Sequence, residues 1–216
     1  MRSAPAVLAV LMLGCSSGSD GHACDRGTRA TNCTVLTTED LTDTCSGYTE
    51  VTGMLHVSGT DAVTLDGMQC LKTLGGALNV ADNPSLVSLQ GLDSLTSVGG
   101  AANIDGNASL RSLDGLQSLA SVGGYLQVMD NASMDSLDGL RSLTTVGGDL
   151  LILSNDSLSS IEALSDLETV TGESIIITSN PMLPTCQAQA LADRLTSAGF
   201  DGTVIIAHND DTATCD

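Results

Sequence analysis

The first candidates for catalytic residues are three aspartates, Asp82, Asp105 and Asp130, because each lies near the end of an expected strand, where their carboxylates could cluster. Paired carboxylates cleave glycosidic bonds when one acts as an acid and the other as a base or nucleophile. No Arg, Lys or His stands beside these aspartates in the sequence to stabilise developing charge. The chain also has no His-Glu-x-x-His zinc motif and no phosphate-binding loop. We therefore expect no catalytic residue and no cofactor, and keep a polysaccharide-processing enzyme as the alternative.

A column of mostly acidic residues raises the question of a metal site. Its members recur once per repeat on an outward position, at Asp66, Gln90, Asp114, Asp138 and Glu162. Successive members would lie about 4.8 Å apart in stacked coils, and divalent cations could bridge like charges at that distance. The spacing of these residues along the sequence matches no calcium-binding loop. We expect a solvated face and no bound metal.

Composition excludes nucleic acid as a partner. The 216 residues contain 7 Lys and Arg against 26 Asp and Glu, a net charge of −19, so no basic surface for phosphate is expected. There is no Trp, with 2 Tyr and 1 Phe, so bases would find few aromatic side chains on which to stack. Because 42% of the residues are hydrophobic, the chain is expected to fold around an aliphatic core.

The N-terminus has the pattern of an export signal. Met1-Arg2 is followed by the apolar run Ala4 to Leu13, which is too short to span a bilayer. Met12-Leu13-Gly14-Cys15 resembles the lipobox of bacterial lipoproteins, which implies a signal peptide over 1–14 and a lipid on Cys15. Ser16, rather than Asp, implies the outer membrane, on its periplasmic side or at the cell surface. The alternative is an ordinary signal peptide with an incidental Cys.

Six further cysteines predict disulfides, because an even number in an exported chain is typical of a covalent framework. Among 15 possible connectivities, proximity in the sequence favours three pairs, Cys24–Cys33, Cys45–Cys70 and Cys186–Cys215. A zinc site is not expected, since the chain has no Cys-x-x-Cys and its three His are scattered. Residues 15–44 are interpreted as the lipidated Cys and a Cys-containing linker.

The body of the chain is a repeat of 24 residues. Four segments align without gaps, and a fifth, 157–181, carries one inserted residue; the four are 61–84, 85–108, 109–132 and 133–156. Self-similarity of this period predicts a solenoid whose coils bury their apolar faces against one another. Within a coil, Leu recurs at every third position until a Gly-Gly pair, which is expected to allow a sharp corner, and the period then becomes two.

The period-two segments predict one strand per coil and hence a parallel sheet. The side chains expected to point inward are Leu55/Val57, Leu78/Val80, Ala102/Ile104, Leu126/Val128, Leu150/Ile152, Ile175/Ile177 and Val204/Ile206. One Asn follows each strand, and we interpret these residues as a side-chain ladder that satisfies backbone groups at the next corner. The ladder comprises Asn83, Asn107, Asn131, Asn155, Asn180 and Asn209. A helix from Cys186 to about Ala198, capped by Thr185 and closed by Gly199, is expected to precede the last strand.

The chain resembles the receptor L domain family in two features. One is the segment Val51-Thr52-Gly53-Met54-Leu55-His56-Val57, and the other is the series of Leu-x-x-Leu-x-x-Val-Gly-Gly-x-Leu-x-Ile coils that follows it. The resemblance covers roughly residues 45–215 and implies an all-β fold, a right-handed parallel β-helix of leucine-rich coils. We accordingly assign the solenoid and its C-terminal helix-strand cap to 45–216. In position, Cys45–Cys70 matches the disulfide cap of the family. The resemblance also implies that the outer face of the strand sheet takes part in ligand binding.

The outward strand positions change character along the chain. They are small or polar in the first coils and become large and apolar in the later ones, at Tyr125, Met129, Leu151, Leu153, Ile176 and Ile205. Exposed apolar residues in a cluster usually mark a contact. They are the candidate partner-binding residues, unless residues 22–44 or a second copy cover them.

These observations predict a non-enzymatic, lipid-anchored binding module of the bacterial cell envelope. Its partners would be the membrane, through the N-terminal lipid, and an envelope protein or glycan. The alternatives are the polysaccharide-processing enzyme and a purely structural spacer lipoprotein.

Overall fold

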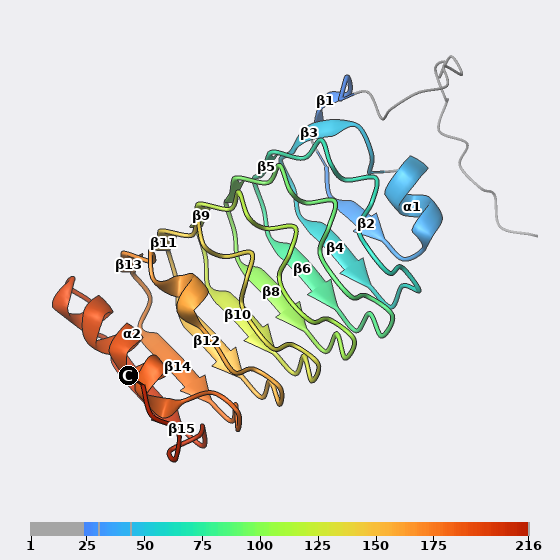
Figure 1. Ribbon diagram of the computed structural model, residues 1–216. Helices are drawn as coiled ribbons and strands as arrows, with labels where there is room; N and C mark the ends of the chain where they lie inside the picture. Colours follow the sequence, from blue (N-terminus) through green and yellow to red (C-terminus); the bar gives the residue numbers. More distant parts are fainter. Residues whose placement is uncertain (1–23, 30, 44, 216) are drawn as a thin grey trace, which may run out of the picture.

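The computed structural model describes residues 24–29, 31–43 and 45–215, which form a β-solenoid with two parallel sheets (Figure 1). Within these residues, the sheet that we call the main sheet has eight strands, hydrogen-bonded in chain order. They are β2 (Cys33–Val35), β4 (Leu55–Ser58), β6 (Leu78–Ala81), β8 (Ala102–Asp105), β10 (Leu126–Met129), β12 (Leu150–Leu153), β14 (Ser174–Thr178) and β15 (Thr203–Ala207). The solenoid predicted from the repeat is confirmed.

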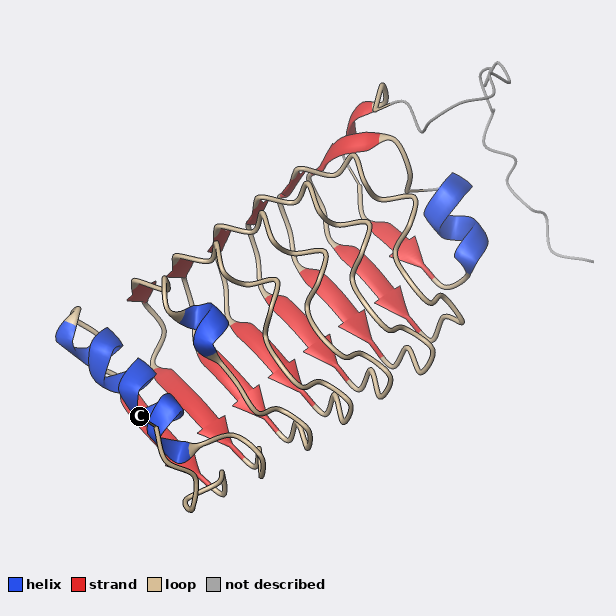
Figure 2. Cartoon of the chain, viewed as in Figure 1, coloured by secondary structure: helices blue, strands red, loops and turns tan. Residues whose placement is uncertain are grey.

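A second, narrower sheet runs along another side of the coils. Over the same described residues it has seven strands, again in chain order: β1 (Gly27–Arg29), β3 (Tyr48–Val51), β5 (Thr73–Leu74), β7 (Ser97–Val98), β9 (Ser121–Val122), β11 (Thr145–Val146) and β13 (Thr169–Val170). Helix α1 (Thr38–Asp43) lies near the N-terminal end, and a 3₁₀ turn, η1 (Glu162–Leu164), and helix α2 (Thr185–Ser197) lie near the C-terminal end (Figure 2). Because β1 and β2 pair with β3 and β4, the coils begin before residue 45, inside the segment that the sequence suggested as a linker.

The core is built from the Leu-every-third-residue arc and the inward strand positions. In one coil, Leu86, Leu89 and Leu92 are all fully buried, and the inward pairs from Leu55/Val57 to Ile175/Ile177 are buried in every coil. The pair Val204/Ile206 is an exception to the prediction. Val204 is 38% exposed and Ile206 is half-buried, because β15 belongs to the last coil and α2 covers its inner side only in part.

The Gly-Gly pairs allow neighbouring coils to approach closely, which differs from the corner freedom that the sequence suggested. A Cβ on Gly123 would lie 2.3 Å from the carbonyl oxygen of Gly99, and one on Gly148 would lie 2.6 Å from the amide nitrogen of Tyr125. None of these pairs in the described chain has a positive φ. The stacked backbones therefore leave no room for a side chain at these positions.

The asparagine ladder runs through the coils as a continuous hydrogen-bonded column. Oδ1 of Asn131 accepts the backbone N–H of Asn107 at 3.1 Å and its Nδ2–H at 3.2 Å. Nδ2 of Asn131 donates to the carbonyl oxygens of Ile104 and Met129 at 3.0 and 2.9 Å. The pattern repeats from Asn83 to Asn180, whose side chains are 0% exposed, and Asn209 continues it at the half-buried C-terminal end.

Helix α2 closes the C-terminal end, but without the cap that the sequence suggested. The residue before the helix is Pro184, and no side chain caps the first turn. The hydroxyl of Thr185 instead donates to Oδ1 of Asp211 at 2.5 Å, because the C-terminal loop lies against the helix start and its Asp210 carbonyl accepts the Thr185 N–H. The other end is as expected, with Gly199 at φ +113° directly after the C-cap residue, Ala198.

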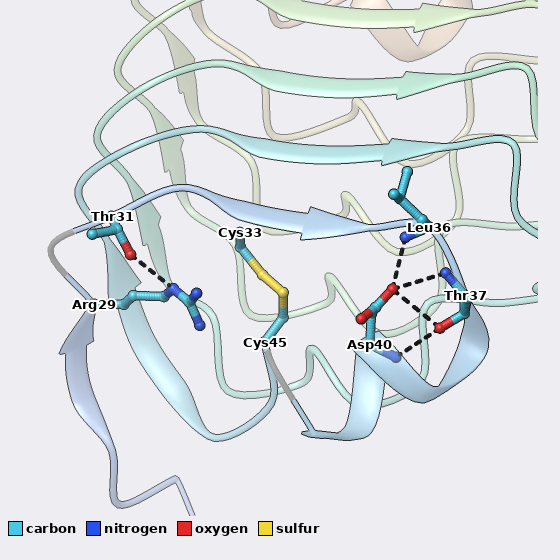
Figure 3. The surroundings of a disulfide bond; sticks show 7 residues. All are labelled: Arg29, Thr31, Cys33, Leu36, Thr37, Asp40 and Cys45. Carbon is cyan, nitrogen blue, oxygen red and sulfur yellow. Dashed lines mark hydrogen bonds between the residues drawn. A yellow bond between two sulfur atoms is a disulfide. The ribbon is translucent and has the colours of Figure 1, made fainter. Parts of the chain in front are cut away.

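Two of the three disulfides differ from the favoured pairing. The bonds are Cys24–Cys70, Cys33–Cys45 and Cys186–Cys215, with Cα atoms 5.3, 5.8 and 6.0 Å apart. Sequence proximity failed at the N-terminus because Cys33 belongs to β2 and points into the core, where α1 turns the chain back to bring Cys45 beside it (Figure 3). Cys70 is then left for Cys24, so the Cys45–Cys70 pair that the family resemblance implied is wrong.

The turn into α1 is fastened by Asp40. Its Oδ2 accepts the N–H groups of Leu36 and Thr37 at 3.0 and 2.9 Å, and the Thr37 hydroxyl at 3.1 Å (Figure 3). The Leu36 N–H holds the pKa of the Asp40 carboxyl below its ordinary value, with the Thr37 groups acting in the same direction. This turn holds the segment that carries Cys45 against β2.

Candidate binding surface

The outer face of the main sheet carries a central column of side chains, one from each coil. In register, these are Thr34, His56, Asn79, Asn103, Gln127, Leu151, Ile176 and Ile205. Neighbouring strands of a sheet lie about 4.8 Å apart, so successive side chains in the column are nearest neighbours on this face. The column changes from polar to apolar at β12, which divides the face into two chemically different halves.

Four of the six candidate partner-binding residues lie in the apolar half of this face, and Met129 on β10 and Tyr125 directly before β10 lie at its border with the polar half. Leu151, Ile176 and Ile205 are consecutive members of the central column, and Met129 and Leu153 pair in the next column. We call the six together the apolar patch: Tyr125, Met129, Leu151, Leu153, Ile176 and Ile205. The Tyr125 side chain is 43% exposed and that of Ile205 is 45% exposed. The other four are half-buried.

No described segment covers the apolar patch. Strand β2 and helix α1 lie at the opposite end of the solenoid from β12, β14 and β15 (Figure 1). Helix α2 turns Ala188, Leu191 and Leu195 into the core, which places it on the inner side of the last coil. The described part of residues 22–44, one of the two suggested covers, therefore does not fill this role.

The three candidate catalytic aspartates lie at the ends of the strands, Asp82 and Asp130 in the turn that follows and Asp105 as the last strand residue. Asp82 and Asp130 occupy the left-handed region, at φ 56° and 55°, which Asp tolerates better than most residues. Asp105 ends β8 between them. Burial raises the pKa of the Asp105 carboxyl above its ordinary value, and the charges of Asp130 and Asp82 raise it further. The turn geometry gives Asp82 and Asp130 a structural role.

Three members of the outward acidic column, Asp66, Asp114 and Asp138, have side-chain partners in their own coil. Asp66 accepts a hydrogen bond from Thr64 at 2.9 Å, and Asp138 pairs with Arg141 at 2.5 Å on an exposed surface. Exposed pairs of this kind contribute little to stability. Within the described residues, no group of three or more His, Cys, Asp and Glu is arranged to hold a metal ion.

A hollow in the polar half of the outer face was missed by sequence reasoning. It has a volume of about 440 Å³ and lies between Met54 and Tyr125, with His56, Asn79 and Asn103 in its lining. The signal that could have found it is the run of polar residues at the same outward position of consecutive strands.

Some of the expectations from the sequence fall outside the described residues. The signal peptide 1–14, the lipidated Cys15 and the first part of the linker belong to this group. Among the helices that the structure describes, none is long and apolar enough to cross a bilayer.

Comparison with known proteins gives one family match. The model of the receptor L domain matches residues 104–195, which run from the end of β8 to the last turn of α2. This segment contains every residue of the apolar patch except Ile205. No curated protein matches the chain in sequence.

Proposed function

We propose, from the premise that residues 104–195 belong to the receptor L domain family, that the chain is a non-enzymatic recognition module of the cell envelope. A receptor L domain suggests a module for binding or recognition. The observation that supports a binding role most strongly is the apolar patch, which lies on one face of rigid, hydrogen-bonded strands with no described segment over it. The partner is an envelope protein that covers this patch.

The side chains of the apolar patch indicate which side chains the partner surface must present. Large aliphatic side chains and a Tyr at the edge are typical of the buried centre of an interface, where a few residues supply most of the binding free energy. Because the chain carries a net charge of −19, a partner with basic residues around an apolar centre would associate fastest.

Replacing Leu151 and Ile176 together with Ser should weaken partner binding by at least about tenfold and leave the melting temperature nearly unchanged. The two side chains are adjacent in the central column and point away from the buried Leu150, Ile152 and Ile175. The measurement is a quantitative pull-down from envelope extracts with the described domain, combined with thermal melting by circular dichroism.

The matched control is the double variant Val63→Ser and Val87→Ser. These valines are 55% and 38% exposed, are hydrogen-bonded to each other through the backbone, and lie outside the main sheet. The control should bind as the wild type does. A marked drop in the melting temperature of the Leu151/Ile176 variant, or dissociation of a dimer, would assign the patch to structural cover and remove it as a partner site.

A lipid on Cys15 would hold the module at the membrane, as the lipobox resemblance implies. Cys15→Ser should therefore shift the protein from the membrane fraction to the soluble fraction and abolish metabolic labelling with palmitate. Ser16→Asp is the matched control, because it leaves the lipidated thiol in place and should retain the label. Labelling that persists in Cys15→Ser would contradict lipid attachment at this residue.

A further inference from the structure

The hollow in the polar half of the outer face is distinct from the apolar patch, although Tyr125 borders both. Its polar lining consists of three consecutive members of the central column, His56, Asn79 and Asn103, on β4, β6 and β8. Met54 and Tyr125, which are 40% and 43% exposed, add apolar walls. Its volume, about 440 Å³, lies within the range of small-molecule sites.

The three polar side chains form a directed chain of hydrogen bonds. Nδ2 of Asn103 donates to Oδ1 of Asn79 at 2.9 Å, and Nδ2 of Asn79 lies 2.6 Å from Nδ1 of His56. An amide NH₂ group can only donate, so Nδ1 of His56 accepts and Nε2 is the ring nitrogen that carries the hydrogen. The His56 end of the chain therefore offers a donor.

The other end of the chain offers an acceptor. Oδ1 of Asn103 is buried and has no hydrogen-bond partner, the one such side-chain atom found among the described residues. Buried polar atoms in folded proteins are nearly always paired, because leaving one unpaired costs free energy. Oδ1 itself is closed to solvent while the rest of the Asn103 side chain is half-buried, so a small rotation of this side chain would bring the oxygen to the hollow. The unpaired acceptor therefore points to a ligand that donates a hydrogen bond there.

We propose that this hollow binds a neutral sugar residue. Hydroxyl groups both donate and accept, so sugar hydroxyls can donate to Oδ1 of Asn103 and accept from Nε2 of His56. The Tyr125 ring and Met54 provide apolar surface for the C–H face of the sugar.

Charge selects a neutral sugar over an acidic one. The polar lining consists of two amides and an imidazole whose Nδ1 accepts a hydrogen bond, and Asp105 lies two residues beyond Asn103 on the same face of β8. The net charge of −19 would also repel an anionic ligand. The sugar site does not depend on the proposed partner site, since its polar contacts come from different coils.

The test is isothermal titration calorimetry and saturation-transfer NMR with cellotetraose, maltotetraose and chitotetraose as neutral probes and tetragalacturonate as the acidic probe. At least one neutral probe should bind, and Asn103→Ala and Tyr125→Ala should each raise its Kd by about tenfold or more. Gln127→Ala is the matched control, because Gln127 follows Asn103 in the central column but does not line the hollow. It should bind as the wild type does.

Several outcomes would overturn the proposal: no neutral probe binds at millimolar concentration, tetragalacturonate binds more tightly, or the Kd is the same in Asn103→Ala. Melting temperatures of the variants identify any that fail to fold, and Tyr125→Ala then carries the test if Asn103→Ala is one of them. The Leu151/Ile176 variant should retain sugar binding, so a failure of the partner site and a failure of the sugar site can be told apart.

Discussion

Gly115→Ala should lower the free energy of unfolding by at least about 3 kcal/mol, the largest effect that we expect from a single methyl group in this protein. A Cβ at Gly115 would lie 2.0 Å from the carbonyl oxygen of Leu89 in the preceding coil and 2.2 Å from its carbonyl carbon. Both atoms belong to the backbone, so relief requires two stacked coils to separate. Chemical denaturation followed by circular dichroism measures the loss.

Gly199→Ala separates this steric effect from backbone strain. Gly199 has the same φ of +113° as Gly115, but no atom lies within 4 Å of the position that its Cβ would take. The substitution should therefore cost only about 1–2 kcal/mol, the penalty for a left-handed backbone at an L-residue. Equal losses for the two variants would contradict close coil packing as the reason for the glycine.

Asn131→Ala should lower the free energy of unfolding by about 3 kcal/mol, since several buried groups lose their partners together. The N–H of Asn107 loses its acceptor, and the carbonyl of Ile104 loses the Nδ2 donor. Asn131 itself is fully buried, which restricts the access of water to these groups. The measurement is again the denaturation midpoint and slope.

Asn209→Ala is the control for the ladder. Asn209 takes part in the same pattern but is half-buried at the open end, so water can replace its side chain. Its loss should be about 1 kcal/mol or less. An Asn131 variant as stable as the Asn209 variant would remove the ladder as a source of stability.

The periodic part of the fold could be predicted from the sequence because each coil repeats the same pattern of buried and exposed residues. Leu at every third position and alternation after each Gly-Gly pair place residues such as Leu89 and Ile152 in the core, and both are fully buried. The ends could not be read in the same way. Val204 obeys the alternation but lacks a following coil to bury it, and Thr185 resembles a helix cap but bonds to the C-terminal loop.

The disulfides and the hollow show a second limit. The two N-terminal disulfides join cysteines 46 and 12 residues apart, because the first coils and the turn-back at α1 decide which cysteines meet, so the sequence distance between two cysteines does not select their partner. The hollow depends on the stacking of the coils, because His56, Asn79 and Asn103 form one hydrogen-bonded chain only when three strands are in register. The outward residues of the apolar patch could be predicted from the alternation alone, because successive side chains of a single strand point to opposite faces of the sheet.

Site-specific photocrosslinking at Ile176 is the most direct test of the claim that the outer face of the main sheet binds a partner. A photoreactive phenylalanine analogue at Ile176 should capture a discrete protein from the cell envelope, whereas the same analogue at the exposed Val87, outside the main sheet, should not. A crosslinked product at Ile176 that disappears when the neighbouring patch residue Leu151 is replaced with Ser would match the account. Equal capture at both positions, or none at Ile176, would contradict it.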